Sequence, residues 1–296
     1  MNTTSAFISI IGRPNVGKSS LLNAMIGEKV AIVSHRPQTT RNRITGILTE
    51  GETQLVFFDT PGMHQPRTRL GDYMVKQVRE SISGIDLALL LIEPLGEIHP
   101  IEKDLLETLR ARNIPAILVV NKIDTLPKKE QMMPKIQAFS QLYDFEDVLP
   151  VSALRGDGVP LVLQKAMAHA QPGPHYFDDD AYTDQPERVI VAEIVREQLL
   201  RHLRDELPHG TAVEIERMSE REDQAIIDIT ATIYCEKSSH KGMIIGKHGA
   251  MLQKIGTRAR MEAERFLDCK VNLQCWVKVR DDWRNREGMI RKMGFE

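Results

Sequence analysis

The chain has 296 residues, of which 42% are hydrophobic and 27% are charged, and its net charge is −2. This length allows about two domains, each able to bury a core. No apolar run approaches the ~20 residues of a membrane-spanning helix, and residues 1–6 do not resemble a secretory signal. The three cysteines have no C-x-x-C spacing, which argues against a disulfide framework or a zinc site and favours the cytoplasm.

A strand is predicted at residues 7–11, followed by a glycine-rich loop and, at residues 20–26, a helical pattern. The loop matches the phosphate-binding pattern G-x-x-x-x-G-K-[ST], which needs this strand–loop–helix context. Its N–H groups and the helix N-terminus attract phosphate. Lys18 adds charge for the outer phosphates, and Ser19 offers a hydroxyl ligand for Mg²⁺. The predicted phosphate-binding residues are Gly12, Arg13, Pro14, Asn15, Val16, Gly17, Lys18, Ser19 and Ser20.

The next informative strand covers residues 55–58 and runs into Asp59, Thr60, Pro61 and Gly62. A carboxylate at the end of a buried strand is well placed to hold Mg²⁺. Gly62 can offer its N–H to the terminal phosphate without steric cost. We therefore predict that this segment closes the phosphate site.

A third strand, residues 116–120, precedes a tetrapeptide that favours guanine. A carboxylate at Asp124 can accept hydrogen bonds from guanine N1–H and the 2-amino group, which adenine cannot supply. The stem of Lys122 can lie along the base, and Asn121 can tie loops together. The predicted residues here are Asn121, Lys122, Ile123 and Asp124.

The last segment of the set is the strand at residues 148–151, followed by Ser152, Ala153 and Leu154. A backbone N–H of this loop can reach the guanine O6. The four segments in this order predict that GTP is the substrate.

These motifs resemble those of the Ras-like GTPases of the translation-factor class, over about residues 6–170. The resemblance implies a doubly wound α/β domain, Mg²⁺ and a switch that responds to the terminal phosphate, here in residues 34–43. Thr40 is the expected switch threonine and Thr39 the reserve. The implied metal ligands are Ser19, Thr40 and Asp59, and the implied catalytic residues are Lys18, Thr40, Gly62 and Asn15.

Met63 stands where Ras-like enzymes carry a water-orienting glutamine. A thioether cannot orient water as a carboxamide does, so slow hydrolysis is expected. In related GTPases an asparagine at the position of Asn15 helps to hold K⁺ beside the phosphates; the alternative is that Asn15 only shapes the loop. We assign no catalytic role to His64 or Gln65. Met63 completes the predicted nucleotide-binding set.

Charge divides the chain unevenly: residues 178–236 carry −10 and residues 237–296 carry +7. Prolines, a glycine and an acidic run predict a linker at residues 171–187. The expected domains are therefore residues 1–170 and 188–296. The basic segment is a candidate surface for nucleic acid or anionic membrane.

The carboxyl-terminal part predicts a helix, two strands, two helices around a G-x-x-G loop at residues 246–249, and a strand. This order resembles a type II KH RNA-binding domain, a smaller α+β domain. Its two glycines keep the loop thin enough for a sugar–phosphate backbone, and an adjacent apolar groove holds about four unstacked bases. The predicted RNA-binding residues are Ile244, Ile245, Gly246, Lys247, His248, Gly249 and Leu252.

A GTPase domain joined to a KH domain resembles the Era family. That resemblance implies an assembly factor for the small (30S) ribosomal subunit that binds the 3′ region of 16S rRNA and associates loosely with the inner membrane. A monomer is the default expectation. Two alternatives stay open: a membrane-surface signalling GTPase whose basic segment meets anionic lipid, and a nucleotide-binding scaffold that hardly hydrolyses GTP.

Overall fold

The structure is a computed structural model that describes residues 3–63, 66, 68–222 and 224–295. It divides into two compact units. The first comprises Met1–Ala31, Thr40–Pro66 and Met74–Asp184, and the second comprises Ile32–Thr39, Arg67–Tyr73 and Gln185–Glu296.

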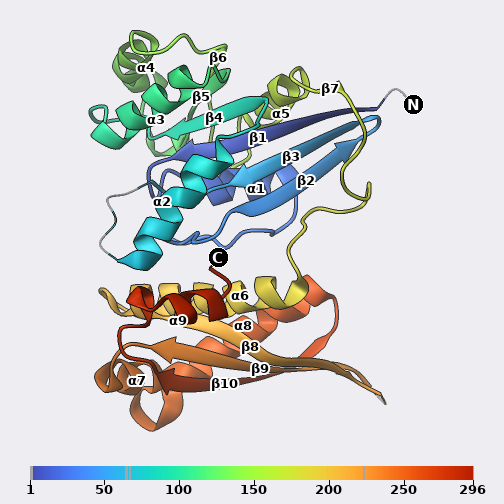
Figure 1. Cartoon of the computed structure of the whole chain (residues 1–296), viewed down its shortest axis with the longest axis vertical. Coiled ribbons are helices and arrows are strands. Elements are labelled where there is room, and N and C mark those ends of the chain that lie inside the picture. The colour runs from blue at the N-terminus through green and yellow to red at the C-terminus, as the bar shows by residue number, and fades with distance from the viewer. Residues whose placement is uncertain (1–2, 64–65, 67, 223, 296) are drawn as a thin grey trace. The chain divides into compact units, whose positions relative to one another are not determined.

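The described part of the first unit contains a seven-stranded sheet, ordered β2-β3-β1-β4-β5-β6, with β7 pairing β1 (Figure 1). Only β2 and β7 run antiparallel to their described neighbours. The strands are β1 (Thr4–Gly12), β2 (Ile44–Glu50), β3 (Thr53–Asp59), β4 (Leu87–Ile92), β5 (Ala116–Val120), β6 (Asp147–Pro150) and β7 (Gln171–Pro172). The helices are α1 (Lys18–Ile26), α2 (Arg69–Ser81, which belongs to this unit from Met74 on), α3 (Pro100–Ala111), α4 (Met133–Ser140) and α5 (Val159–Met167).

The central strands are buried on both faces, as the near-continuous apolar composition of β4 requires. Leu87, Leu89 and Leu91 pack in one cluster with residues of α1 and α5. The alternate residues Ala88, Leu90 and Ile92 pack in another with residues of α2, α3 and α4. The predicted doubly wound α/β fold is confirmed. The strand order of the sheet reverses beside β1, and folds of this kind bind ligands at such a point, at the carboxyl ends of the strands.

Residues 171–184 belong to the first unit although their composition predicts a linker. The side chain of Gln54 accepts from the main-chain N–H groups of Tyr176 and Phe177, at 2.7 and 3.1 Å. Thr183 Oγ1 donates to the carbonyl of Thr45 at 2.7 Å. This extended segment therefore satisfies its backbone against β2 and β3 rather than against solvent alone.

The second unit has the element order predicted for a type II KH domain, and the helices α6 and α8 cover one face of its sheet (Figure 1). Strand β9 is central, antiparallel to β8 and parallel to β10. The elements are α6 (Glu187–His202), β8 (Ala212–Arg221), β9 (Gln224–Cys235), α7 (Ser238–Ile245), α8 (Ala250–Leu267), β10 (Lys270–Val279) and α9 (Glu287–Lys292). The α+β fold class is confirmed.

Residues 32–39, which overlap the predicted switch segment 34–43, pack against α6 within the second unit. The guanidinium of Arg36 donates to the carbonyls of Leu200, Leu203 and Asp205, at 3.0, 2.7 and 3.2 Å. Carbonyls at a helix end have no partner in the helix, so this arginine supplies one. The fully buried carboxylate of Glu197 accepts from the N–H of Val33 at 3.0 Å. The buried carboxylate of Glu197 on α6 thus has a main-chain partner in this segment.

Candidate nucleotide site and RNA-binding loop

The phosphate-loop pattern lies between β1 and α1, at the end of a central strand where the fold predicts a ligand. Gly17 occupies the N-cap of α1, so the N-terminus of that helix opens onto the loop. Lys18 is 6% exposed, and its Nζ donates to the carbonyls of Gly12 and Arg13, at 3.1 and 3.0 Å. Burial lowers the pKa of Lys18 to about 8, and the nearby carboxylate of Asp59 only partly offsets this. A phosphate here would supply the missing negative charge.

Three side-chain oxygens converge beside this lysine. Ser19 Oγ lies 2.6 Å from Asp59 Oδ2 and 2.9 Å from Thr40 Oγ1, and Thr40 Oγ1 lies 3.3 Å from the same carboxylate oxygen. Burial raises the pKa of Asp59, although Lys18 and hydrogen bonds from Ser19, Thr40 and Thr60 lower it. Its other oxygen, Oδ1, is buried without a hydrogen-bond partner among the described residues. One carboxylate and two hydroxyls suit a hard cation such as Mg²⁺.

The two candidate switch threonines differ in what they contact. Thr40 is 6% exposed and faces the carboxylate, as given above. Thr39 Oγ1 instead donates to the carbonyl of Arg36 at 2.7 Å, within its own turn. The geometry therefore favours Thr40 over Thr39 as the metal ligand.

Gly62 approaches the phosphate loop so closely that no side chain fits. A Cβ on Gly62 would lie 2.6 Å from Pro14 Cα. The hydroxyl of Thr60 donates to the carbonyl of Ile10 at 2.9 Å and fixes the start of this segment. The side chain of Met63 packs against the apolar cluster on the α2–α4 face of the sheet. Met63 thus has a packing role, and His64 and Gln65 lie outside the described residues.

Asn121 joins the two loops that the sequence assigns to the phosphates and the base. Its Nδ2 donates to the carbonyl of Val16 at 2.8 Å, and its Oδ1 accepts from the N–H of Ala153 at 3.0 Å. Ser152 Oγ donates to Asp124 Oδ1 at 2.6 Å, which orients the predicted guanine-reading carboxylate. Leu154 is 84% exposed, so only its main chain remains a candidate for base contact.

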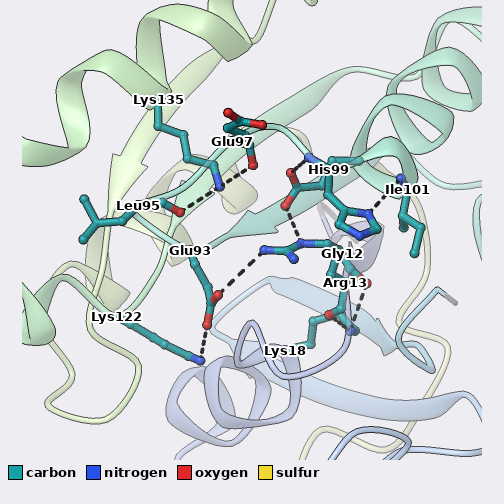
Figure 2. A network of polar contacts seen from close by, with 11 residues as sticks. Gly12, Arg13, Lys18, Glu93, Leu95, Glu97, His99, Ile101, Lys122 and Lys135 are labelled. Atoms are coloured by element: carbon teal, nitrogen blue, oxygen red, sulfur yellow. Dashed lines mark hydrogen bonds and ion pairs between the residues drawn. The ribbon is translucent and has the colours of Figure 1, made fainter.

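Two predicted phosphate-loop residues have side chains that the pattern alone does not explain. Asn15 is exposed and adopts a left-handed conformation with φ +64°, and its role toward K⁺ stays a prediction. The guanidinium of Arg13 points toward α3 and pairs with Glu102, which sequence reasoning missed (Figure 2). Glu93, also missed, pairs with Lys122 at 2.5 Å (Figure 2). Neither glutamate belongs to a recognised motif, so only the structure identifies them.

The G-x-x-G loop connects α7 to α8 and depends on its first glycine. Gly246 has φ +73° and ψ 175°, a region that is essentially restricted to glycine. A Cβ there would also lie 2.7 Å from that of Met251. Lys247 and His248 are exposed between the two glycines. The loop thus presents a thin backbone with a cation at its tip.

The apolar residues predicted beside this loop are not equally accessible. Ile244 is fully buried in the core of the second unit, so it supports the loop from below and does not line a surface groove. Ile245 and Leu252 are half-buried and remain candidates. Met243, which sequence reasoning did not select, is 61% exposed on α7.

Comparison with known proteins agrees with this arrangement. A family model for 50S ribosome-binding GTPases matches residues 7–122, and a model for KH domains matches residues 206–284. GTPase Era of Ruminiclostridium cellulolyticum is 49% identical over 296 residues, covering 100% of this chain and 99% of that protein. GTPase Era of Clostridioides difficile is 47% identical over 291 residues, covering 98% of each. The chain belongs to the Era family of GTPases.

Solved Era structures share the fold along the whole chain. A variant of Aquifex aeolicus Era bound to GDP·AlF4⁻ matches with a TM-score of 0.95 and 34% identity, covering 99% of each chain. The crystal structure of Era with MgGDPNP and nucleotides 1506–1542 of 16S ribosomal RNA matches equally well, with the same score, identity and coverage. Membership in the Era family makes this chain a GTP-hydrolysing enzyme, so the scaffold alternative is not retained. Among the helices of the described residues, none has the length and apolarity needed to cross a bilayer.

Proposed function

We propose that this chain is a GTP-dependent switch that binds the 3′ region of 16S rRNA through its KH domain and acts in small-subunit assembly. Two features of the same chain carry the proposal. A carboxylate and two hydroxyls that suit Mg²⁺ lie beside the phosphate loop, and basic side chains without a described carboxylate partner lie around the G-x-x-G loop. The likeness to an Era that was crystallised with MgGDPNP and 16S rRNA nucleotides supports this reading.

At the nucleotide site, Lys18 and the N-terminus of α1 bind the phosphates, and Gly62 offers its N–H to the terminal phosphate. The hydroxyls of Ser19 and Thr40 and the carboxylate of Asp59 hold Mg²⁺, which neutralises charge that develops on the phosphates. Asp124 accepts hydrogen bonds from guanine, and Asn121 holds the phosphate loop and the loop of Ala153 together. These residues bind and orient GTP, whereas Met63, at the position of the switch glutamine, packs against an apolar cluster.

Hydrolysis by this chain is therefore proposed to be slow and stimulated by K⁺ beside the phosphate loop. The exposed side chain of Asn15, in a loop whose backbone is already fixed, supports this part of the proposal. Single-turnover hydrolysis in K⁺ and in Na⁺ tests it. Equal rates in the two salts would contradict a role for K⁺ and leave Asn15 as a residue that shapes the loop.

The RNA-binding part of the proposal depends on how cations distribute in the second unit. Five basic side chains in or beside α7, the G-x-x-G loop and the first half of α8 have no ion-pair partner among the described residues: Lys237, Lys241, Lys247, Lys254 and Arg258. Further along the unit, five basic side chains are paired with carboxylates: Arg260 with Glu264, Arg265 with Glu262, Lys278 with Glu216, Arg284 with Glu236 and Lys292 with Glu214. Four others, Lys270, Arg280, Arg286 and Arg291, have no ion-pair partner among the described residues. Around the loop the charge is uncompensated throughout, because every basic side chain from Lys237 to Arg258 lacks a described carboxylate partner, and a sugar–phosphate backbone would lie there.

Binding of a labelled RNA with the sequence of nucleotides 1506–1542 of 16S rRNA tests this function. A scrambled RNA of the same composition serves as the comparison. We expect selective binding that falls at least tenfold in a variant carrying Gly246→Asp and Gly249→Asp. As a control, Gly288→Asp adds one such charge in the same unit, at a glycine with open space around it. The proposal would be overturned if binding did not depend on RNA sequence and if the wild-type and variant proteins bound anionic vesicles equally. That result would favour anionic lipid as the partner of the basic segment.

The role in small-subunit assembly needs its own test. Depletion of the protein in its host should cause immature 30S particles to accumulate, and wild-type protein should restore mature subunits. A normal subunit profile after depletion would contradict the assembly role while leaving RNA binding intact.

A further inference from the structure

Four charged side chains form a continuous network beside the phosphate loop (Figure 2). They come from four separate parts of the first unit. Glu93 follows β4, Lys122 follows β5, Arg13 lies in the phosphate loop, and Glu102 lies in the first turn of α3. The network therefore joins the segment assigned to the base with the segment assigned to the phosphates.

Glu102 is the fixed end of this network. Its side chain is fully buried, and both of its carboxylate oxygens are used. Oε1 accepts from Arg13 Nε at 2.8 Å, and Oε2 accepts from the N–H of His99 at 2.9 Å. The second bond is half of a capping box at the start of α3. A carboxylate held by a helix cap has little freedom, so it anchors the arginine that it binds.

Arg13 is consequently held at both its main chain and its side chain. Its carbonyl accepts from Lys18 Nζ at 3.0 Å, while its guanidinium lies between Glu102 and Glu93. Figure 2 shows the guanidinium directed toward the carboxylate of Glu93, away from the amine of Lys18. This geometry does not suit an arginine that stabilises phosphate charge directly. It suits a residue that fixes the path of the loop.

Glu93 forms the link to the base side. Its Oε1 lies 2.5 Å from Lys122 Nζ, and its Oε2 lies 3.7 Å from Arg13 Nη2. A lysine whose stem lies along a purine must give up rotamer freedom on binding. Pairing with Glu93 in the protein alone removes part of that cost before the nucleotide arrives.

We propose that Glu102 and Glu93 are positioning residues for guanine nucleotide, acting through Arg13 and Lys122 on the phosphate loop and the base site. This inference rests on the proposed nucleotide-binding function of the same site. The two glutamates differ in expected effect. Glu102 is buried, whereas Glu93 and Lys122 are more than a third exposed, and exposed ion pairs contribute little.

The variants Glu102→Gln and Glu93→Gln test the proposal against Glu97→Gln. Glu97 lies in the same loop as Glu93 and makes its described contact, with Lys135, through its carbonyl. We expect the GTP dissociation constant to rise about tenfold for Glu102→Gln, twofold to fivefold for Glu93→Gln and less than 1.5-fold for Glu97→Gln. The KM for GTP should rise in parallel while kcat stays within twofold, because the lost interaction serves binding in ground and transition states alike.

A double-mutant cycle separates positioning from general loss of structure. If Glu93 acts through Lys122, the effects of Glu93→Gln and Lys122→Met on GTP affinity will be non-additive, whereas additive effects would overturn the link. Affinity in Glu102→Gln and Glu93→Gln equal to that of Glu97→Gln would overturn the proposal as a whole. Glu93→Gln remains informative if the buried variant does not fold, because its site is exposed. Failure of the wild-type protein to bind GTP would refute the proposed function instead.

Discussion

Replacement of Asn121 by alanine offers a quantitative test of how the nucleotide site is held together. The side chain is 2% exposed and makes two hydrogen bonds to backbone groups of different loops, the carbonyl of Val16 and the N–H of Ala153. Alanine removes both bonds and leaves the buried carbonyl of Val16 and the part-buried N–H of Ala153 without their partner. Each such group costs about 1–3 kcal/mol, so the variant should lose roughly 2–6 kcal/mol in all.

This loss divides between the free energy of unfolding of the nucleotide-free protein and the free energy of GDP binding. Urea unfolding measures the first, and titration with a fluorescent GDP measures the second. Expressed wholly in affinity, the range corresponds to roughly 30-fold to 10⁴-fold. Thr125→Val is the control, because its hydroxyl donates to the carbonyl of Lys122 at an exposed position. A combined loss for Asn121→Ala below about 0.5 kcal/mol, no larger than the control, would refute the reasoning.

Gly246→Ala should weaken RNA binding more than Gly249→Ala in a direct titration: both glycines have a positive φ, but only at Gly246 does a Cβ also clash, whereas at Gly249 it meets nothing within 4 Å; equal effects would contradict this. Thr40→Val should raise the Mg²⁺ concentration needed for GTP hydrolysis at least tenfold, whereas Thr39→Val should change it less than twofold; the reverse order would reassign the switch threonine. Burial raises the pKa of Cys275 to about 11, so its thiolate fraction at pH 8 is about one in a thousand. The rate of its alkylation, measured by mass spectrometry, should therefore rise about tenfold per pH unit up to that pKa. Rapid alkylation of Cys275 at pH 8 in the folded protein would disprove it.

Much of the fold could be predicted because its signals are local. The apolar strands of the first unit are each followed by a motif, and the parallel arrangement brings those motifs to one edge of the sheet. The KH order was readable from alternation in β9 and β10 and from the G-x-x-G spacing between two helical patterns. The resemblance to known families added the identity of the substrate class to these patterns.

The remainder depends on contacts between distant residues, which periodicity cannot reveal. Glu102 reads as an ordinary residue in the first turn of a helix, and only the fold brings it to Arg13. The burial of Ile244 follows from the packing of α7 on the sheet, so a sequence that places it beside a glycine loop suggests a surface role that the structure does not give it. Residues 171–184 have the composition of a linker but satisfy their backbone on the first unit.

In the function proposed above, one chain links a guanine-nucleotide switch to an RNA-binding loop. The most direct measurement is the affinity for a non-hydrolysable GTP analogue with and without saturating RNA of the sequence of nucleotides 1506–1542, with GDP measured in parallel. Binding linkage is reciprocal, so RNA should strengthen binding of the analogue at least fivefold and leave GDP affinity nearly unchanged. Identical affinities for the analogue with and without RNA would show two independent binding functions and contradict the switch.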